Sequence, residues 1–235
     1  MDYKASSSSG PLRPADGFTL VEALLVIGVL AILLALLLPA MFKARDSANT
    51  VKCVGNLKQI GAGLMAYVSD HDGALIPAAV LKTNDYWFDE LNRYMGYPSY
   101  GPNYVYPGSS SVGQGFPLPW QLCPTRKMQP VARQAVAYGW NYINFGYTAS
   151  NANNNSHSRL QQVSDPARTI IIGDSKDADA SPNNDFQFRY IYERDGPVLP
   201  GRHQGRANYL MLDGHVEAFA PGDLPKNHPF WKKFK

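Results

Sequence analysis

The chain has few of the residue patterns that identify an enzyme or a metalloprotein. It has two cysteines, Cys53 and Cys123, and no C-x-x-C pair, which argues against a zinc ribbon or a thioredoxin-like site. It contains no G-x-S-x-G, no H-E-x-x-H and no phosphate-binding loop, so an enzyme is not indicated. The formal net charge is only +3, and no stripe of Lys or Arg alternates with aromatics. Nucleic acid is therefore not an expected partner.

The two cysteines leave two alternatives open. If the domain that holds them is exported to an oxidising compartment, one disulfide can form between Cys53 and Cys123. The other interpretation is a pair of unbonded, half-buried thiols. Their spacing in the sequence does not decide between the disulfide and the free thiols.

One long apolar segment is present near the start of the chain. Residues 23–42 carry no charge, and about 20 helical residues cross the ~30 Å hydrocarbon core of a bilayer. A cleaved secretory signal has a shorter apolar region and a small-x-small cleavage site after it, and no convincing site follows residue 38. We therefore predict that the segment remains in the protein as a membrane anchor.

Glu22 is the one charged side chain between Phe18 and Phe42. An ionised carboxylate within a membrane costs ~2.5–3.5 kcal/mol on insertion scales, so we expect Glu22 to have a partner. Cleavage after Gly17 would create a positive amine at Phe18, one helical turn from Glu22 and on the same face. That amine could pair with the carboxylate within a chain or between neighbouring chains, and the helix dipole also favours an acid in the first turn.

The stretch G-F-T-L-V-E, followed by the apolar segment, resembles the N-terminal signature of type IV pilins and type II secretion pseudopilins. The resemblance implies that a prepilin peptidase cuts between Gly17 and Phe18 on the cytoplasmic side, and that Phe18 is then N-methylated. It implies that Glu22 neutralises the terminal amine of a neighbouring subunit during assembly. It also implies a helix kink at Pro39, with the leader inside the cell and the globular domain outside the membrane.

Helical periodicity continues beyond the anchor. Apolar residues recur three or four apart from Val51 to Val68, which predicts an amphipathic helix that ends near Asp70 and packs on a small sheet. The sequence also predicts a second, short helix over residues 86–97, with aromatic side chains that anchor it. Three glycines weaken the long helix but permit close approach of a neighbour: Gly55, Gly61 and Gly63.

Strand patterns appear late in the chain, over residues 168–174 and 186–193. A hairpin is predicted over 207–220, with a two-residue type I′ turn at Asp213-Gly214. The expected fold is α+β and pilin-like, a long N-terminal helix packed on a small antiparallel β-sheet head with long loops. The predicted domain limits are a leader (1–17), a membrane and filament-core helix (18–42), an amphipathic helix (43–72) and a β-rich head (73–235).

Nine residues separate His203 from Asp213-Gly214. This spacing resembles a subgroup of prepilin-like proteins with a C-terminal His-x9-Asp-Gly element. Asp174, His203, Asp213 and His215 have the atom types of metal ligands, and the resemblance to calcium-holding pseudopilins adds calcium as an alternative to no cofactor. The simpler interpretation is structural, because Asp213 and Gly214 suit a turn and His203 can bond a loop backbone.

Two functions of different class follow from these observations. The first is a non-enzymatic filament subunit of a type IV pilus-like or type II secretion pseudopilus. Its implied partners are other pilin-like subunits, prepilin peptidase, an inner-membrane assembly platform and membrane lipid, with the head in the periplasm or outside the cell. The second is a singly anchored module that binds a glycan or protein through the Tyr- and Gly-rich loop at 97–120 and does not polymerise. A third, a metal-dependent hydrolase, has no motif behind it.

Overall fold

The structure is a computed structural model in two compact units, residues 1–44 and 45–235, each described below by itself. Three predictions lie outside the described residues: the Gly17–Phe18 cleavage site, most of the loop at 97–120, and the first part of the 186–193 strand. The residues that the structure describes are 19–80, 85–97, 120, 122–125, 137–141, 145, 158–175, 191–193, 196–197, 202–220, 222–225 and 228–231.

Helix α1 (Leu20–Asp70) confirms the predicted long helix. In the first unit its large apolar side chains are exposed, with fractions from 50 to 77% between Leu20 and Phe42. Within the described residues α1 is the one helix that is long and apolar enough to cross a membrane, with a mean hydropathy of 3.0 in its most apolar window. Pro39 lies inside the helix and supplies no backbone N–H there. The kink at Pro39 stays a prediction.

The second unit is built on a four-stranded antiparallel sheet in the order β3-β4-β7-β8, which confirms the α+β prediction. Helix α2 and strand β4 also agree with their predicted positions. The strands of this sheet are β3 (Tyr138–Trp140), β4 (Ile170–Asp174), β7 (Ala207–Met211) and β8 (Val216–Phe219). The remaining elements are β1 (Ala79–Val80), β2 (Asp85–Tyr86), α2 (Trp87–Tyr94), η2 (Leu160–Gln162), η3 (Pro166–Arg168), β5 (Tyr192–Glu193), β6 (Gly196–Pro197) and η5 (Pro229–Trp231).

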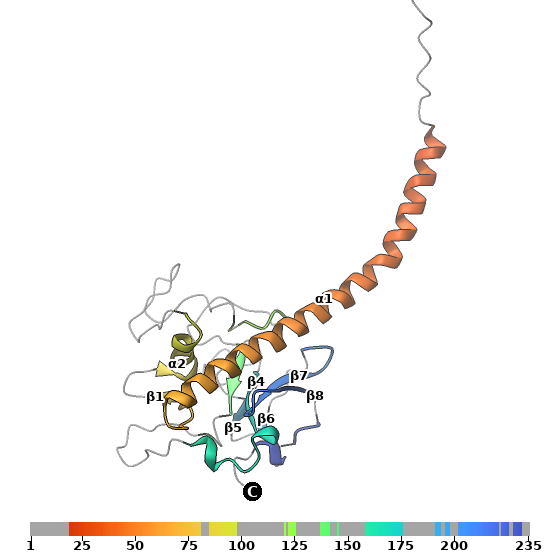
Figure 1. Cartoon of the computed structure of the whole chain (residues 1–235). Coiled ribbons are helices and arrows are strands. Elements are labelled where there is room, and N and C mark those ends of the chain that lie inside the picture. Colours follow the sequence, from red (N-terminus) through yellow and green to blue (C-terminus); the bar gives the residue numbers. More distant parts are fainter. Residues whose placement is uncertain are drawn as a thin grey trace, which may run out of the picture. The chain divides into compact units, whose positions relative to one another are not determined.

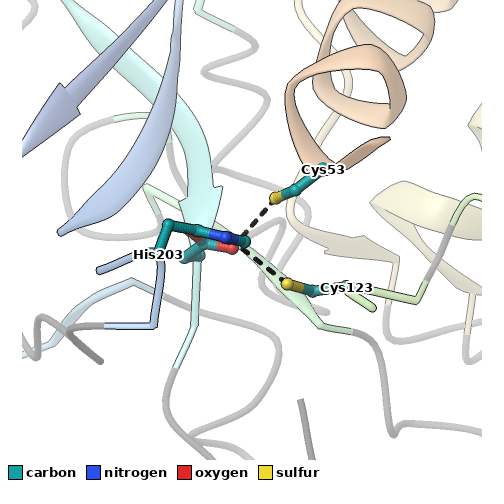
Figure 2. A group of neighbouring side chains, drawn as sticks. Cys53, Cys123 and His203 are labelled. Carbon is teal, nitrogen blue, oxygen red and sulfur yellow. Dashed lines mark hydrogen bonds and ion pairs between the residues drawn. The ribbon is translucent and has the colours of Figure 1, made fainter. Parts of the chain in front are cut away.

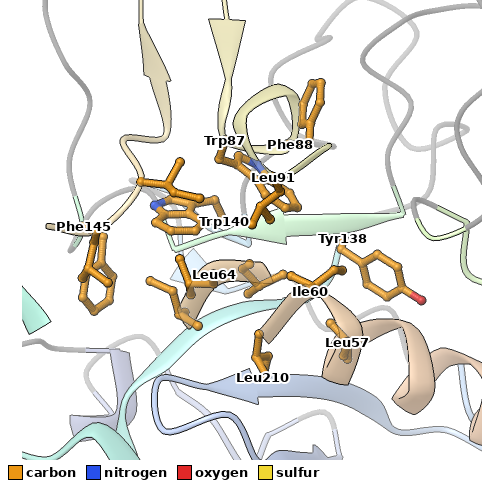
Figure 3. Close-up of a cluster of buried hydrophobic side chains, with 14 of the residues drawn as sticks. Leu57, Ile60, Leu64, Trp87, Phe88, Leu91, Tyr138, Trp140, Phe145 and Leu210 are labelled. Atoms are coloured by element: carbon orange, nitrogen blue, oxygen red, sulfur yellow. The ribbon is translucent and has the colours of Figure 1, made fainter. Parts of the chain in front are cut away.

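The second part of α1 packs against one face of this sheet (Figure 1). Leu57, Ile60 and Leu64 are completely buried, and Figure 3 shows them between the sheet residue Leu210 and the aromatic side chains of the short helix and β3. The buried stripe begins at Cys53, because Val51 is 71% exposed. Side chains three and four positions apart lie on one helix face, so the sequence pattern was sufficient to place this contact.

The opposite face of the sheet has its own core. Side chains along β7 alternate, as strand geometry requires: Tyr209 joins this second core, whereas Leu210 faces α1. Strand β4 departs from this alternation, because its pairing with β7 shifts between Ile170 and Ile172. The irregularity lets Ile171 and Ile172 both join the core beneath α1.

The β7–β8 hairpin confirms the two predicted strands and corrects the predicted turn. Asp213 does not have a positive φ, as a type I′ turn requires, whereas Gly214 has φ +94°. The Gly214 N–H donates to the Met211 carbonyl (2.9 Å), and the Met211 N–H donates to His215 (2.8 Å), so the loop has three residues. The extra residue is Leu212, whose side chain is fully buried and whose N–H donates to the Thr169 carbonyl (2.9 Å). Anchoring Leu212 in the core therefore lengthens the turn.

Gly173 permits the close pairing of β4 with β7. A Cβ built at Gly173 would overlap the ring of Tyr209, its partner across the strands. That ring is fully buried and packs against Phe219 and Trp231, with centroids 5.9 and 5.8 Å away, so it has little room to move.

We expect Gly173→Ala to lower the free energy of unfolding by about 1–3 kcal/mol, the usual range for overpacking a core. Gly55→Ala is the matched control, because a Cβ at Gly55 meets no atom within 4 Å. That control should raise stability by up to about 1 kcal/mol through helix propensity. Urea unfolding of the full-length protein in detergent measures the free energy of unfolding of both variants. Equal midpoints for the two variants would contradict the packing argument.

Candidate functional sites

The first candidate site is the start of α1, where Glu22 forms a capping box with Thr19. The Thr19 N–H and hydroxyl both donate to Glu22 Oε2 (2.8 Å each), and the Glu22 N–H donates to Thr19 Oγ1 (3.2 Å). This reciprocal arrangement satisfies backbone donors that every helix start leaves unpaired. Glu22 therefore has a partner within its own chain, which the sequence reasoning missed. The Thr-x-x-Glu spacing ahead of an apolar run was the signal that could have found it.

The second candidate site is a buried cluster of four side chains from four separate segments. Figure 2 shows Cys53 on α1, with Cys123 and His203 facing it from other segments. Asp174, the last residue of β4, completes the cluster. All four residues are buried, with exposed fractions of 0% for Cys53, 2% for Cys123, 0% for Asp174 and 4% for His203. One ligand atom from each lies within 4.8 Å of the other three.

The contacts within this Cys-Cys-Asp-His cluster are short and polar. His203 Nε2 lies 3.2 Å from Asp174 Oδ2 and 3.4 Å from the sulfur of Cys123. The sulfur of Cys53 lies 3.5 Å from Asp174 Oδ1. Both cysteines are free thiols in the structure, and the disulfide between them stays a prediction.

A tight turn directs His203 into the cluster. The backbones of His203 and Arg206 exchange two hydrogen bonds, His203 N–H to Arg206 (2.9 Å) and Arg206 N–H to His203 (3.1 Å). Between them Gln204 and Gly205 both have positive φ, +54° and +83°. Positive φ at both central residues is the mark of a type I′ turn, so the turn type predicted at Asp213-Gly214 occurs here instead.

The position of Cys123 is fixed from the helix side. Asn56 lies three residues after Cys53 on the buried face of α1, and its side-chain amide donates to the Leu122 carbonyl (2.9 Å). The same amide donates to the hydroxyl of Tyr138 (3.2 Å), which in turn donates to the sulfur of Cys53 (3.4 Å). One buried asparagine thus connects the helix, β3 and the segment that carries Cys123.

Charged neighbours set the protonation of the cluster. Arg202 NH1 lies 3.5 Å from Asp174 Oδ1, with both side chains almost fully buried. Burial by itself would lower the pKa of His203, but its hydrogen bonds to Asp174 and Cys123 outweigh this effect and raise the pKa to about 9. A hydrogen bond from Cys53 lowers the pKa of Cys123, and the same bond together with burial raises the pKa of Cys53. The shifts of the Cys123 and His203 pKa values therefore favour a negative sulfur beside a positive imidazole ring.

The structure separates the residues that the sequence grouped as metal ligands. Asp174 and His203 meet in the cluster, but Asp213 lies on the exposed β7–β8 loop, where its Oδ1 bonds His215 Nδ1 (2.6 Å). The prediction that Asp213 shares a site with Asp174 and His203 is therefore wrong, because the three-residue loop turns Asp213 outward. The two cysteines were considered only as a disulfide or as free thiols.

The comparisons with known proteins concern the N-terminal signature and a part of the chain. Residues 12–38 match the model of the prokaryotic N-terminal methylation motif. The ComG operon protein 3 homolog of Bacillus licheniformis is 37% identical over 70 residues, which are 30% of this chain and 72% of the relative. Competence protein ComGC of Halalkalibacterium halodurans is 34% identical over 76 residues, 32% of this chain and 74% of the relative.

Type II secretion system core protein G of Pseudomonas aeruginosa is 37% identical over 59 residues, 25% of this chain and 42% of the relative. No solved structure matches the chain. The long helix on a small antiparallel sheet and the methylation motif together define the class of type IV pilin-like proteins. The chain belongs to this family, as a pilin- or pseudopilin-type structural subunit, and its apolar helix indicates membrane anchoring.

Asp174→Asn should strongly destabilise the head, because it leaves Arg202 and His203 without their buried anion. Removing one partner of a buried ion pair costs about 3–5 kcal/mol. Asp213→Asn is the matched control, since its pair with His215 is solvent-exposed, and it should change stability by less than about 1 kcal/mol. Thermal unfolding of the full-length protein distinguishes the two variants. Similar losses of stability in both would contradict the assignment of Asp174 as the buried anion of Arg202 and His203.

Proposed function

We propose that the chain is the precursor of a filament subunit that is cut after Gly17 and N-methylated at Phe18. The match to the methylation motif over residues 12–38, which contains both positions, carries this proposal. The exposed apolar part of α1 supports assembly, because its side chains have no partner within the described part of this chain. In a filament they pack against the same segment of neighbouring subunits, and before assembly against lipid.

Glu22 receives the new terminal amine during assembly in this proposal. The capping box supports the role, because it holds the carboxylate at the first turn of α1 instead of leaving a long side chain free. A carboxylate oxygen accepts more than one hydrogen bond, so an amine of a neighbouring subunit can join the Thr19 donors. The pairing removes an uncompensated charge from apolar surroundings, which is the driving force for its formation.

The further partners in this proposal are a prepilin peptidase and an inner-membrane assembly platform. The leader (1–17) stays on the cytoplasmic side, and the head lies in the periplasm or outside the cell.

The relatives include competence proteins and a secretion protein, so both a pilus-like and a secretion-type filament have support. The secretion relative is named a core protein of its system, which supports a subunit without catalytic activity. The alternative of a glycan- or protein-binding module gains no support from Trp120. This side chain is buried, and its indole N–H donates to Asn92 Oδ1 (3.2 Å).

Two substitutions separate the charge of Glu22 from its capping function. Glu22→Gln keeps an acceptor for Thr19, because glutamine also completes a capping box, but it cannot neutralise an amine. We expect normal membrane insertion and at least about tenfold fewer filaments, since the lost ion pair is worth more than about 1.4 kcal/mol in apolar surroundings. The measurement compares the amount of subunit in filaments sheared from the cells with the amount of subunit that remains bound to the membrane.

Glu217→Gln on β8 is the control, because Glu217 is an exposed acid in the head and should leave assembly unchanged. Glu22→Ala removes both the charge and the cap. Normal filaments from Glu22→Gln together with failure of Glu22→Ala would assign Glu22 to helix capping alone. Normal filaments from both variants would overturn the pairing proposal.

The intact mass of the membrane-extracted protein tests the processing step. We expect a mature chain that begins at Phe18 and carries one added methyl group. Gly17→Leu should retain the leader, because the resemblance places a glycine before the cut. A wild-type chain that retains Met1 in cells with an active prepilin peptidase would contradict cleavage and would favour the singly anchored module.

A further inference from the structure

We propose that Cys53, Cys123, Asp174 and His203 form a structural site for a divalent transition metal ion of the zinc type, which fastens α1 to the head. The proposal concerns the head unit alone and holds whether or not the chain assembles into filaments. It rests on the geometry of the cluster, on its donor atoms and on the groups that orient them.

The spacing of the donor atoms fits a tetrahedral ion. Zinc binds sulfur at about 2.3 Å and nitrogen or oxygen at about 2.0–2.2 Å, so tetrahedral ligands are separated by roughly 3.3–3.8 Å. The structure places His203 Nε2 3.4 Å from the Cys123 sulfur and 3.2 Å from Asp174, and the Cys53 sulfur 3.5 Å from Asp174. These three separations agree with a tetrahedral site, although the two Asp174 distances are to different oxygens, Oδ2 for His203 and Oδ1 for Cys53. One donor atom from each of the four residues lies within 4.8 Å of the other three, so modest side-chain shifts would place all four around one ion.

The donor set selects the class of ion. Two thiolates and an imidazole are ligands of zinc and similar transition metals, whereas carboxylates and carbonyls suit calcium and magnesium. Calcium, the ion considered from the sequence, takes about 6–8 oxygen ligands, and this cluster offers two sulfurs, one nitrogen and one carboxylate. Four protein ligands close the coordination sphere, which is the arrangement of structural zinc sites and not of catalytic ones.

Neighbouring groups orient His203 for coordination through Nε2. Thr50 on α1 donates its hydroxyl hydrogen to the Asp46 carbonyl (2.9 Å), and its Oγ1 lies 3.3 Å from His203 Nδ1. Because that hydrogen is already engaged, Nδ1 must be the donor in the contact with Thr50. With its proton on Nδ1, His203 has Nε2 as the nitrogen that can coordinate an ion, and Nε2 lies beside the sulfur of Cys123, the arrangement usual for metal-binding histidines.

The other ligands are supported in the same way. The backbone N–H of Asn208 on β7 donates to Asp174 Oδ2 (2.8 Å). Two thiolates and one carboxylate around a divalent ion leave one negative charge, and the Arg202 guanidinium, 3.5 Å from Asp174, compensates it. The buried site is therefore neutral when an ion is bound, so the penalty for an isolated buried charge does not arise.

The ion would connect four segments that are distant in the sequence: α1, the segment at 122–125, the end of β4, and the turn at 202–206. Closing long loops with one ion restricts the unfolded chain, as a disulfide does. The His-x9-Asp-Gly element then divides into two roles: His203 is a ligand, and Asp213-Gly214 forms part of the three-residue loop that connects β7 to β8. A metal site gives the histidine of that element a chemical function.

The test begins with full-length protein purified in detergent under reducing conditions and dialysed against zinc. Elemental analysis should find about one zinc ion per chain. Replacement by Co²⁺ should produce the intense visible bands of tetrahedral cobalt and a thiolate charge-transfer band in the near ultraviolet. Removing the ion with a chelator should lower the unfolding temperature. A chain that takes up no zinc, or a cobalt spectrum without a thiolate band, would overturn the proposal, as would a Cys53–Cys123 disulfide in protein extracted without reductant.

Variants locate the ion within the chain. Cys123→Ser and His203→Ala should each lose more than about 100-fold in zinc affinity, beyond the roughly 10–100-fold typical of supporting residues. His215→Ala is the matched control, because His215 is an exposed histidine bonded to Asp213, and it should keep wild-type affinity and spectrum. Unchanged zinc affinity in Cys123→Ser would place the ion elsewhere and overturn the site.

Thr50 tests the orientation of the ligand without removing it. Thr50→Val keeps the shape of the side chain but has no acceptor for His203 Nδ1, so zinc affinity should fall about 10–100-fold. Thr50→Ser should restore it, because serine keeps the hydroxyl. Equal affinities for the valine and serine variants would contradict the proposed role of His203 as an oriented ligand.

Discussion

The buried carboxylate of Asp174 is the constraint around which the head is arranged. A carboxylate at the end of a central strand, with no exposed surface, is tolerated only if charged and hydrogen-bonding groups surround it. Arg202 and His203 supply these groups from one side, and the backbone of Asn208 supplies another from β7. Cys53 reaches the same carboxylate from α1. One polar centre therefore joins the helix to the sheet at the start of an otherwise apolar contact.

That centre explains the local conformation of several segments. The turn before β7 needs two residues with positive φ, because a tight reversal there is what brings His203 back over Asp174. The segment at 122–125 is held to α1 by Asn56, and this contact delivers Cys123 to the same point. A metal ion would complete the centre by replacing thiol and imidazolium protons with one shared cation. In either state the helix packs on the sheet through apolar side chains, and the cluster adds polar contacts from Cys53.

The two parts of α1 differ in what covers them, and this difference underlies the function of the chain. The part in the second unit buries its apolar stripe within its own chain, whereas the part in the first unit exposes apolar side chains around its whole circumference. A helix that is apolar all round requires lipid or other helices as its surroundings. In the proposed assembly, the chain meets lipid first and other subunits afterwards. Thr19 and Glu22 cap the helix at its start, and the proposed role of Glu22 is to receive the amine of a neighbouring subunit there.

The sequence by itself determined the long helix, its membrane-length apolar part, the buried strand β4 and the two strands of the β7–β8 hairpin. These features depend on local spacing and side-chain type, which a linear pattern records directly. The Thr-x-x-Glu spacing at the start of the apolar run belongs to the same local kind of signal, because it marks a capping box. Only the tertiary structure decided the hairpin turn, because burial of Leu212 lengthened the loop. Only the tertiary structure could bring Cys53, Cys123, Asp174 and His203 together, since their gaps of tens of residues carry no local pattern and their meeting depends on how the helix packs on the sheet.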